Sequence, residues 1–307
     1  MLQGAKILIT GPTGQVAFPI ARELAKANDV YAVARFGNPQ RRELLEGLGI
    51  TCMQKSFAED DLSDLPDDFT HVLHFAVYQE VGAVDFDYGI AVNAVGAGRL
   101  MSHCRRAKAF LHCSTTAVYA SRGHEPFKES DSLLATVMDK MSPVYGISKI
   151  AGEAVAKFAS QEWDLPTTIA RLNVPYGASG GLPAIHLAMI REGQDIPLHP
   201  DKPSYYSPMH EEDYIEQAVK LLEVASVPPV VVNWCGSERV SAEEWCDYLG
   251  SLVGVKPKLA YVDGAIGTAC CDTTLMHKLI GPTKVGWREG MRRMVEAAPS
   301  EGRRLEA

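Results

Sequence analysis

Several features that would mark a secreted, membrane or metal-binding protein are missing from this sequence. Its seven cysteines show no Cys-x-x-Cys spacing and its nine histidines form no His-x-x-x-His pair, which disfavours a bound metal ion. An odd, scattered set of cysteines in apolar segments is typical of free thiols in a reducing compartment. No apolar run approaches the ~20 residues that a membrane span requires. We therefore expect no metal ion, no membrane partner and a cytoplasmic protein.

The sequence also lacks a signal peptide and a basic surface. The chain enters a predicted strand at position 5, which leaves no room for a cleavable leader. The net charge is −8, with acidic and basic residues mixed along the chain. A nucleic-acid partner is disfavoured because phosphate binding requires a concentrated positive face. With 307 residues, 46% of them hydrophobic, the chain can hold a large core and has an ordinary globular composition.

Short apolar runs alternate with helix-like stretches over the first half of the chain. This alternation predicts an α/β fold with a doubly wound parallel sheet of the Rossmann type. Right-handed crossovers place the carboxyl ends of these strands at one edge of the sheet. Strands are predicted at residues 5–10, 29–35, 50–54, 70–77, 108–114 and 165–171, with later ones at 228–233 and 258–262. A long helix is predicted within residues 84–106, with Asn93 near its middle.

A change of rhythm after Gly177 predicts a second, smaller lobe. Residues 1–177 are expected to form the dinucleotide-binding lobe, and residues 208–236 to return to it. Residues 178–207 and 237–307 are expected to form a smaller mixed α/β lobe that covers the sheet edge and supplies the substrate pocket.

The first predicted strand runs into a glycine turn. Gly11, Gly14 and Ala17 have the spacing Gly-x-x-Gly-x-x-Ala, and a helix-like stretch follows. Gly11 permits the tight turn, and Gly14 lets backbone N–H groups at the start of the helix approach a pyrophosphate. Ala17 stands where a third glycine is common. This turn predicts a dinucleotide site.

The second predicted strand ends in Ala34 and Arg35, where NAD-binding folds usually place Asp or Glu. A guanidinium can bind a ribose 2′-phosphate in a bidentate manner, whereas a carboxylate would repel it. We therefore predict NADP(H) in preference to NAD(H), with Arg41 and Arg42 as additional cations. The alternative is that Arg35 is a surface residue and that either dinucleotide binds.

A tyrosine and a lysine stand four positions apart in a predicted helix. Residues at i and i+4 share one helical face, so Tyr145 and Lys149 point into the same space. The ammonium would favour the phenolate and lower a pKa that starts near ~10, which suits proton transfer at neutral pH. A hydroxyl cluster at residues 114–116 ends the fifth predicted strand, at the same sheet edge. The glycine turn, the hydroxyl cluster and this helix are therefore predicted to converge.

With these segments the chain resembles the extended short-chain dehydrogenase/reductase family, often labelled NAD-dependent epimerase/dehydratase. The resemblance covers nearly the whole length, and the order of its motifs is specific for family and fold. It is carried by the glycine turn, His74-Phe75-Ala76, Asn93, Ser114-Thr115-Thr116-Ala117-Val118-Tyr119, Ser142-Pro143-x-Tyr145-Gly146-x-Ser148-Lys149, Arg171-x-x-Asn173-Val174-x-Tyr176-Gly177, Pro208-Met209-His210-x-x-Asp213 and Thr283-Lys284-Val285-Gly286-Trp287-x-Glu289-Gly290.

The resemblance implies roles for particular residues. Tyr145 would donate or accept the proton at the reacting oxygen, and Lys149 would lower the pKa of Tyr145 and bind the nicotinamide ribose. Thr115 would hydrogen-bond the same oxygen, with Ser114 as the alternative. Asn93 would be either an exposed helix residue or a buried support, and the helices of Asn93 and Tyr145 would pair in a homodimer. The expected cofactor contacts are Gly11, Thr13, Gly14, Gln15, Val16, Arg35, Phe75, Ala76, Val77, Tyr145, Lys149 and Val174.

Two departures from the family pattern bear on the substrate. Dehydratases of this family resemble Thr-Asp-Glu where this chain has Thr115-Thr116-Ala117, so dehydration lacks its acid and base. Nucleotide-sugar enzymes tend to carry an arginine where this chain has Ser204-Tyr205-Tyr206-Ser207, and an unpaired diphosphate is costly to desolvate. We therefore predict a non-nucleotide small molecule. Candidate substrate contacts, each with ordinary packing as the alternative, are Tyr78, Thr116, Tyr176, His186, Tyr205 and Tyr206.

Three hypotheses follow. The leading one is an NADP(H)-dependent oxidoreductase that transfers a hydride between nicotinamide and a carbonyl or hydroxyl carbon of a small molecule. The second is a nucleotide-sugar epimerase that holds NAD(P) tightly and shows no net redox change. The third is a regulator that senses NADP(H) without turnover, which is disfavoured because Thr115, Tyr145 and Lys149 are all present.

Overall fold

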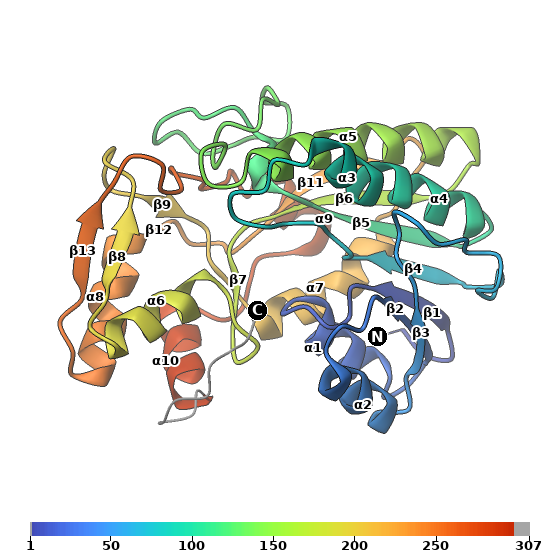
Figure 1. Ribbon diagram of the computed structural model, residues 1–307, viewed down its shortest axis with the longest axis horizontal. Coiled ribbons are helices and arrows are strands. Elements are labelled where there is room, and N and C mark those ends of the chain that lie inside the picture. The colour runs from blue at the N-terminus through green and yellow to red at the C-terminus, as the bar shows by residue number, and fades with distance from the viewer. Residues whose placement is uncertain (1, 298–307) are drawn as a thin grey trace.

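A seven-stranded parallel sheet forms the centre of the protein (Figure 1). The computed structural model describes residues 2–297. The strand order is β11-β6-β5-β4-β1-β2-β3, so the direction of winding switches between β1 and β4. The predicted doubly wound α/β architecture is confirmed. The strands are β1 Lys6–Thr10, β2 Asp29–Ala34, β3 Thr51–Gln54, β4 His71–His74, β5 Ala109–Thr115, β6 Thr167–Leu172 and β11 Val230–Trp234.

Helices cover both faces of this sheet, as Figure 1 shows. Successive strand residues point to opposite faces: Leu8 packs with the layer of α4 and α5, whereas Ile7 and Ile9 pack with the opposite layer. The first layer contains α4 Gly96–His103 and α5 Pro143–Glu162. The second contains α1 Ala17–Leu24, α2 Pro39–Gly47, α7 Glu211–Glu223 and α9 Thr274–Ile280.

The long helix predicted over residues 84–106 is not uniform. A π-helical turn, Ala91–Val95, joins α3 Phe86–Ile90 to α4. Asn93 lies in this turn and is fully buried. Gly96 follows directly and packs on Phe57, because a Cβ at Gly96 would lie 2.7 Å from the Phe57 Cβ. A regular helix was expected here. The π turn instead brings the Asn93 side chain against Tyr78, which follows β4, and Ser148 of α5.

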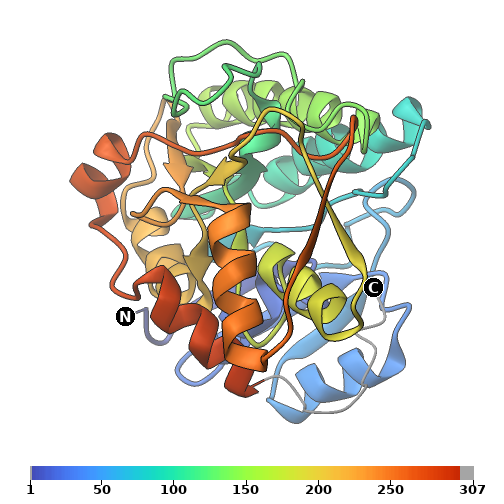
Figure 2. The same cartoon turned by 90° about the vertical axis from the view of Figure 1, so that its left-hand side faces the viewer.

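A smaller lobe contains α6 Leu182–Arg191, α8 Ala242–Val253 and α10 Trp287–Ala297. In Figure 2, α8 lies between α6 and α10, and it contacts both. Trp245 of α8 is fully buried in the core of this lobe. Helix α8 begins with a capping box of Ser241 and Glu244 and ends before Gly254, which has φ +70°.

The sequence did not predict α9, the 3₁₀ turn Thr116–Val118 or most of the short strands. These strands pair with partners far along the chain, so no local pattern marks them. They are β7 Pro175–Tyr176 with β10 Met209–His210, β9 Tyr205–Tyr206 with β12 Val240–Ser241, and β8 Asp195–Leu198 with β13 Lys258–Tyr261, of which only β13 was predicted. Met276 and Ile280 of α9 pack on the sheet and not on the smaller lobe. Over residues 2–297, every helix is too short or too polar to cross a bilayer.

Candidate active site

A cleft of about 490 Å³ opens at the carboxyl ends of β1, β4, β5 and β6. Open α/β sheets bind their ligands at this edge. The predicted residues that line it are Gly11, Gly14, Gln15, Val16, Phe75, Val77, Thr115, Thr116, Tyr145, Lys149, Val174 and Tyr206. The predicted residues that do not line it are Thr13, Arg35, Ala76, Tyr78, Tyr176, His186 and Tyr205.

The glycine turn forms one end of the cleft. Gly11 has φ +67°, and a Cβ there would lie 2.9 Å from the Ala76 backbone nitrogen, so a side chain at position 11 would collide with the end of β4. Thr10 secures this contact because its Oγ1 accepts hydrogen bonds from Phe75 N at 3.0 Å and Ala76 N at 2.9 Å. Helix α1 starts just after the turn without an acidic residue in its first turn, which suits a pyrophosphate.

Helix α5 presents Tyr145 and Lys149 to the other end of the cleft. The helix packs closely on the end of β5 because Gly146 has no side chain. A Cβ at Gly146 would lie 2.9 Å from the carbonyl oxygen of Ala117. This close approach brings Tyr145 beside Thr115, which acts to lower the pKa of the Tyr145 phenol.

Asn93 connects the segment that follows β4 to α5. Its Oδ1 accepts a hydrogen bond from Tyr78 N at 2.8 Å. Its Nδ2 donates to Tyr78 O at 3.0 Å and to Ser148 Oγ at 2.8 Å. Asn93 is therefore a buried support, and the alternative of an exposed helix residue is wrong.

Burial dominates the acidity of Tyr145. Removal from water raises the pKa of its phenol above the usual value, and the hydrogen bond with Thr115 opposes this only in part. Burial also lowers the pKa of Lys149, whose Nζ donates to the carbonyl oxygen of Cys113 at 2.7 Å. In this structure burial outweighs the contact with Thr115, and the predicted lowering of the Tyr145 pKa by Lys149 stays a prediction.

A buried ion pair supports the floor of the site. Arg171 donates to Glu153 in a bidentate manner, with Nε to Oε1 at 2.9 Å and Nη2 to Oε2 at 2.8 Å. Burial acts to raise the pKa of Glu153, but hydrogen bonds from Arg171 and Ser114 hold it below its usual value. Ser114 Oγ donates to Glu153 Oε1 at 2.6 Å. The Ser114 hydroxyl is thus engaged by Glu153, whereas Thr115 contacts the Tyr145 phenol.

Thr116 and Tyr206 are the predicted substrate residues that face the cleft. Thr116 Oγ1 accepts a hydrogen bond from Asn173 Nδ2 at 2.8 Å. The Tyr206 hydroxyl donates to the carbonyl oxygen of Ile266 at 3.0 Å, and its ring packs against Trp245 at 5.2 Å between centres. Both side chains can contact a ligand, but their polar atoms already have protein partners.

The remaining predicted substrate residues pack elsewhere. His186 accepts a hydrogen bond from Trp245 Nε1 at 2.9 Å, and burial lowers its pKa to about 4. Tyr205 is covered by the Arg239 guanidinium, 3.8 Å from its ring centre. The ring of Tyr78 packs edge-on against Tyr88.

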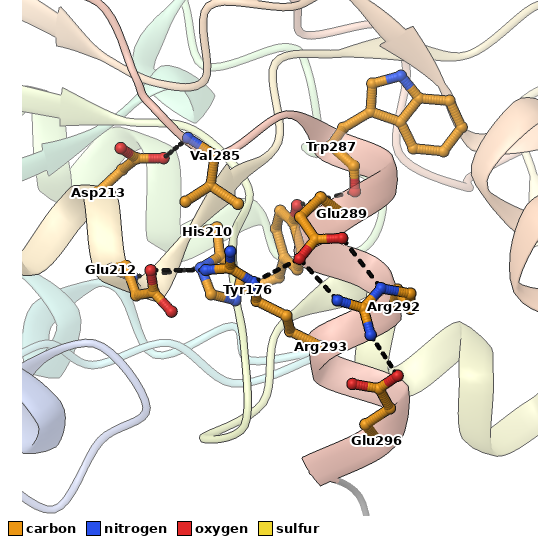
Figure 3. Close-up of polar contacts among 10 residues, drawn as sticks. All are labelled: Tyr176, His210, Glu212, Asp213, Val285, Trp287, Glu289, Arg292, Arg293 and Glu296. Carbon is orange, nitrogen blue, oxygen red and sulfur yellow. Dashed lines mark hydrogen bonds and ion pairs between the residues drawn. The ribbon is translucent and has the colours of Figure 1, made fainter.

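Tyr176 belongs to the contact between α10 and the sheet lobe (Figure 3). Its hydroxyl donates to the carbonyl oxygen of Trp287 at 3.2 Å, and a Cβ at Gly290 would lie 2.3 Å from that hydroxyl. Arg293 of α10 donates to Glu289 at 2.8 Å and to Glu212 of α7 at 2.7 Å. Tyr176 is therefore held within an interface between two helices and a short strand.

The sequence did not predict the apolar wall of the cleft. Its residues come from loops and from the start of α6, so no spacing pattern relates them. Of the described residues that line the cleft, Lys149 is the only one with a charged side chain. The unpredicted wall residues are Val81, Val137, Met138, Met141, Leu182, Ile185, Ile266 and Ala269, with Gln79 and Ser142 as polar neighbours.

Comparison with known proteins identifies the family. Residues 7–234 match the NAD dependent epimerase/dehydratase family, so the chain belongs to it and the resemblance is confirmed. The protein is 26% identical over 282 residues to one from Bacillus subtilis (strain 168) named uncharacterized UDP-glucose epimerase YtcB, covering 85% of this chain and 86% of that protein. Members of this family are NAD-dependent enzymes.

Solved structures share the fold over nearly the whole chain. UDP-glucuronic acid 4-epimerase from Bacillus cereus, in complex with UDP-glucuronic acid and NAD, has a TM-score of 0.82 at 21% identity, covering 95% of this chain and 98% of that one. UDP-N-acetylglucosamine 4-epimerase from Methanobrevibacter ruminantium M1, in complex with UDP-N-acetylmuramic acid, has a TM-score of 0.83 at 16% identity, covering 96% and 98%.

These comparisons correct the predicted cofactor. We predicted NADP(H) from Arg35, but the family is described as NAD dependent, and the Bacillus cereus epimerase was solved with NAD. Arg35 is exposed and does not line the cleft. Arg41 lies over the Phe18 ring at 4.9 Å, and Arg42 pairs with Glu46 at 2.8 Å. Arg41 and Arg42 therefore have other partners, and a lone exposed arginine is weak evidence for a 2′-phosphate site.

Proposed function

We propose that the protein binds NAD in the cleft and interconverts epimers at a hydroxyl-bearing carbon of a nucleotide sugar. The observation that supports this most directly is that one cleft is lined by the glycine turn at one end and by Thr115, Tyr145 and Lys149 at the other. The named relatives favour this epimerase hypothesis over the non-nucleotide reductase that the sequence suggested first.

The residues at the glycine turn fit a dinucleotide. The backbone at Gly11 approaches β4 so closely that only glycine is accommodated, and the open space beside it continues into the cleft. The turn and the start of α1 would hold the pyrophosphate, Phe75, Val77 and Val174 would flank the dinucleotide, and Lys149 would bind its ribose. When bound, NAD supplies a hydride acceptor and, in its reduced form, a hydride donor.

Tyr145 moves the proton in this proposal. Its phenolate form would take up the proton of the substrate hydroxyl as that carbon is oxidised, and the resulting phenol would return the proton on re-reduction. Thr115 hydrogen-bonds the same oxygen and stabilises developing negative charge there. Lys149 supplies the nearby positive charge that a buried phenolate requires. Return of the hydride to the opposite face of the keto intermediate inverts the carbon without net redox change.

The test is to incubate the purified protein with NAD and UDP-glucose, UDP-glucuronic acid or UDP-N-acetylglucosamine and to resolve the 4-epimers by chromatography. We expect interconversion without accumulation of NADH, and none with the Tyr145→Phe variant. The proposal fails if no epimer forms although calorimetry shows that NAD binds.

One specific observation favours a second candidate, an NAD-linked dehydrogenase or reductase of an uncharged substrate. Among residues 2–297, the cleft wall carries no arginine and no charged side chain besides Lys149, so a diphosphate would be desolvated without a cationic partner from this part of the chain. Net formation of NADH with a panel of secondary alcohols, or its consumption with ketones, would support this candidate. Tight calorimetric binding of UDP-sugars with epimer formation would exclude it.

We further propose that the two lobes divide the work. Residues 1–177 and 208–236, with α9 packed on them, would hold the cofactor, and residues 178–207 and the rest of 237–297 would shape the substrate half of the cleft; the predicted residues 298–307 lie outside the described part of the chain. The return of residues 230–234 to the sheet as β11 supports this division. A cytoplasmic location is also proposed, supported by seven cysteines that are all free thiols.

A further inference from the structure

Two histidines stand side by side in the sheet close to Lys149. His74 ends β4 and lies opposite His112 of β5 in the strand register. Their exposed fractions are 1% and 0%. Their ring centres lie 5.5 Å apart at an interplanar angle of 35°, and no hydrogen bond joins the rings. Lys149 is close enough to both rings to disfavour their protonated forms.

The hydrogen bonds of Thr10 determine the protonation of His74. Thr10 Oγ1 accepts from Phe75 N and Ala76 N, which occupies both of its lone pairs. Its own proton must therefore be donated to His74 Nδ1, which lies 2.8 Å away. His74 Nδ1 is thus an acceptor, and the neutral ring carries its proton on Nε2.

Three ring nitrogens of this pair have no partner within residues 2–297: His74 Nε2, His112 Nδ1 and His112 Nε2. Buried polar atoms without a hydrogen bond are unfavourable and uncommon, and internal water is a usual partner for them. The His74 ring can only donate from Nε2, whereas a neutral His112 ring offers one donor and one acceptor. A single water molecule can accept from His74 and donate to His112.

The packing of α5 provides a polar neighbour for this pair. Gly152 has no side chain, and the position that its Cβ would occupy lies 3.5 Å from His112 Nε2 and 2.5 Å from the carbonyl oxygen of Asn93. An imidazole nitrogen and a carbonyl oxygen of the π turn therefore lie beside the same point on α5. A Cβ at position 152 would collide with the Asn93 carbonyl oxygen and would be in ordinary van der Waals contact with His112 Nε2.

We propose that His74 and His112 form a buried hydration site. A water molecule accepts a hydrogen bond from His74 Nε2–H and donates one to the unprotonated nitrogen of His112. Both rings can then stay neutral beside the Lys149 ammonium. The water molecule supplies hydrogen bonds to their nitrogens, so neither ring has to take up a second proton. It does not depend on the identity of the substrate, so its failure would leave the proposed function untouched.

A crystal structure of the full chain at about 1.5 Å resolution tests the site directly. We expect a density peak within hydrogen-bonding distance, about 3 Å, of His74 Nε2 and one nitrogen of His112. The absence of a peak at well-ordered rings would overturn the proposal.

A matched pair of variants gives an independent test. His112→Gln keeps a polar group that can bind the water, whereas His112→Leu, of similar volume, removes it. We expect His112→Leu to lower the melting temperature by about 2–6 °C more than His112→Gln. Equal melting temperatures, or a more stable Leu variant, would show that the rings are dry and overturn the proposal.

Ser204→Ala is the control. Ser204 Oγ is also buried without a partner, but it lies in the smaller lobe, away from Lys149. Among residues 2–297, Ser204 Oγ is a lone unpaired atom, whereas the two rings together present three unpaired nitrogens that one water can bridge. We therefore expect removal of the Ser204 hydroxyl to leave the melting temperature unchanged or to raise it. If Ser204→Ala destabilised the protein as much as His112→Leu, the stability difference at His112 would no longer indicate a hydration site.

Discussion

The ammonium of Lys149 donates a hydrogen bond to the carbonyl oxygen of Cys113 at 2.7 Å, although Tyr145 lies one helical turn away on the same helix. The sequence pattern paired the Lys149 ammonium with the Tyr145 phenol, but in the structure the end of β5 accepts its hydrogen bond. Tyr145 lies beside Thr115, and burial raises the pKa of its phenol. Tyr145 and Lys149 share one helical face, but their pKa values are shifted mainly by burial where α5 packs on the sheet.

Tyr145→Phe should remove catalysis and leave the fold intact. The variant loses the proton carrier but keeps the ring, so we expect the turnover rate to fall about 10²–10⁴-fold with no change in NAD affinity beyond about twofold. Tyr248→Phe, in the smaller lobe and outside the cleft, is the control and should retain full activity. An active Tyr145→Phe enzyme would rule out the assigned role.

Gly152→Ala should destabilise the protein, although alanine normally favours a helix. The new Cβ would lie 2.5 Å from the carbonyl oxygen of Asn93, so α5 must move away from the π turn. Gly47→Ala is the control because its Cβ would meet no atom within 4 Å at the end of α2. Thermal unfolding should show a lower melting temperature for Gly152→Ala and an equal or higher one for Gly47→Ala. The reverse order would contradict this packing.

Breaking the Glu153–Arg171 pair from one side should be strongly destabilising. Glu153→Gln leaves the buried Arg171 guanidinium without its counter-charge, which costs about 3–5 kcal/mol. Replacement of both residues by methionine should recover part of this loss, because no unpaired charge remains. Denaturant unfolding of Glu153→Gln, of Glu153→Met, of Arg171→Met and of the double methionine variant measures the effect. A double variant less stable than the sum of its single variants would argue against an isolated pair.

Stability should fall on acidification below about pH 6.5. Burial lowers the pKa of His74 to about 3 and of His186 to about 4, and holds the pKa of His112 well below its usual value. The folded state cannot take up these protons, whereas the unfolded chain does so below about 6.5, so stability is full above that pH and is lost as pH falls towards the folded values. Melting temperatures between about pH 7 and about pH 5 should show a shallower decline for His112→Gln. An unchanged slope would mean that His112 titrates normally when folded.

We propose that the protein is a homodimer through the α5 face. Ile147 and Phe158 of α5 and Val95 of the π turn are 45%, 62% and 46% exposed, which is unusual for apolar side chains near one another. Size-exclusion chromatography with light scattering should give twice the chain mass, and Phe158→Glu should give monomers. Leu44→Glu, at an equally exposed leucine of α2, is the control and should remain dimeric. A monomeric wild-type protein would refute the proposal.

Local spacing was enough to predict several parts of this site. Gly11 and Gly14 could be predicted to form a dinucleotide-binding turn because the strand, the tight turn and the helix N-terminus are formed by neighbouring residues. Tyr145 and Lys149 could be paired because helical geometry depends only on their separation. The alternation of strands and helices predicted the sheet for the same reason.

The tertiary structure decided everything that depends on distant partners. Tyr176, His186 and Tyr205 looked the same in sequence as Tyr206, yet they pack against Trp287, Trp245 and Arg239 and leave the cleft to Tyr206. The tertiary structure also decided the apolar wall of the cleft, because its residues come from segments that share no sequence spacing.

The sequence by itself determined the family and the fold and predicted the proton-transfer residues, because each of these rests on short-range spacing. The tertiary structure alone decided which hydroxyl faces Tyr145, which group holds Lys149, and that His74 lies opposite His112. Those relationships arise from strand register and helix packing between segments far apart in the chain, and they set burial. Burial in turn controls the pKa values of Tyr145 and the histidines, which no local pattern can specify.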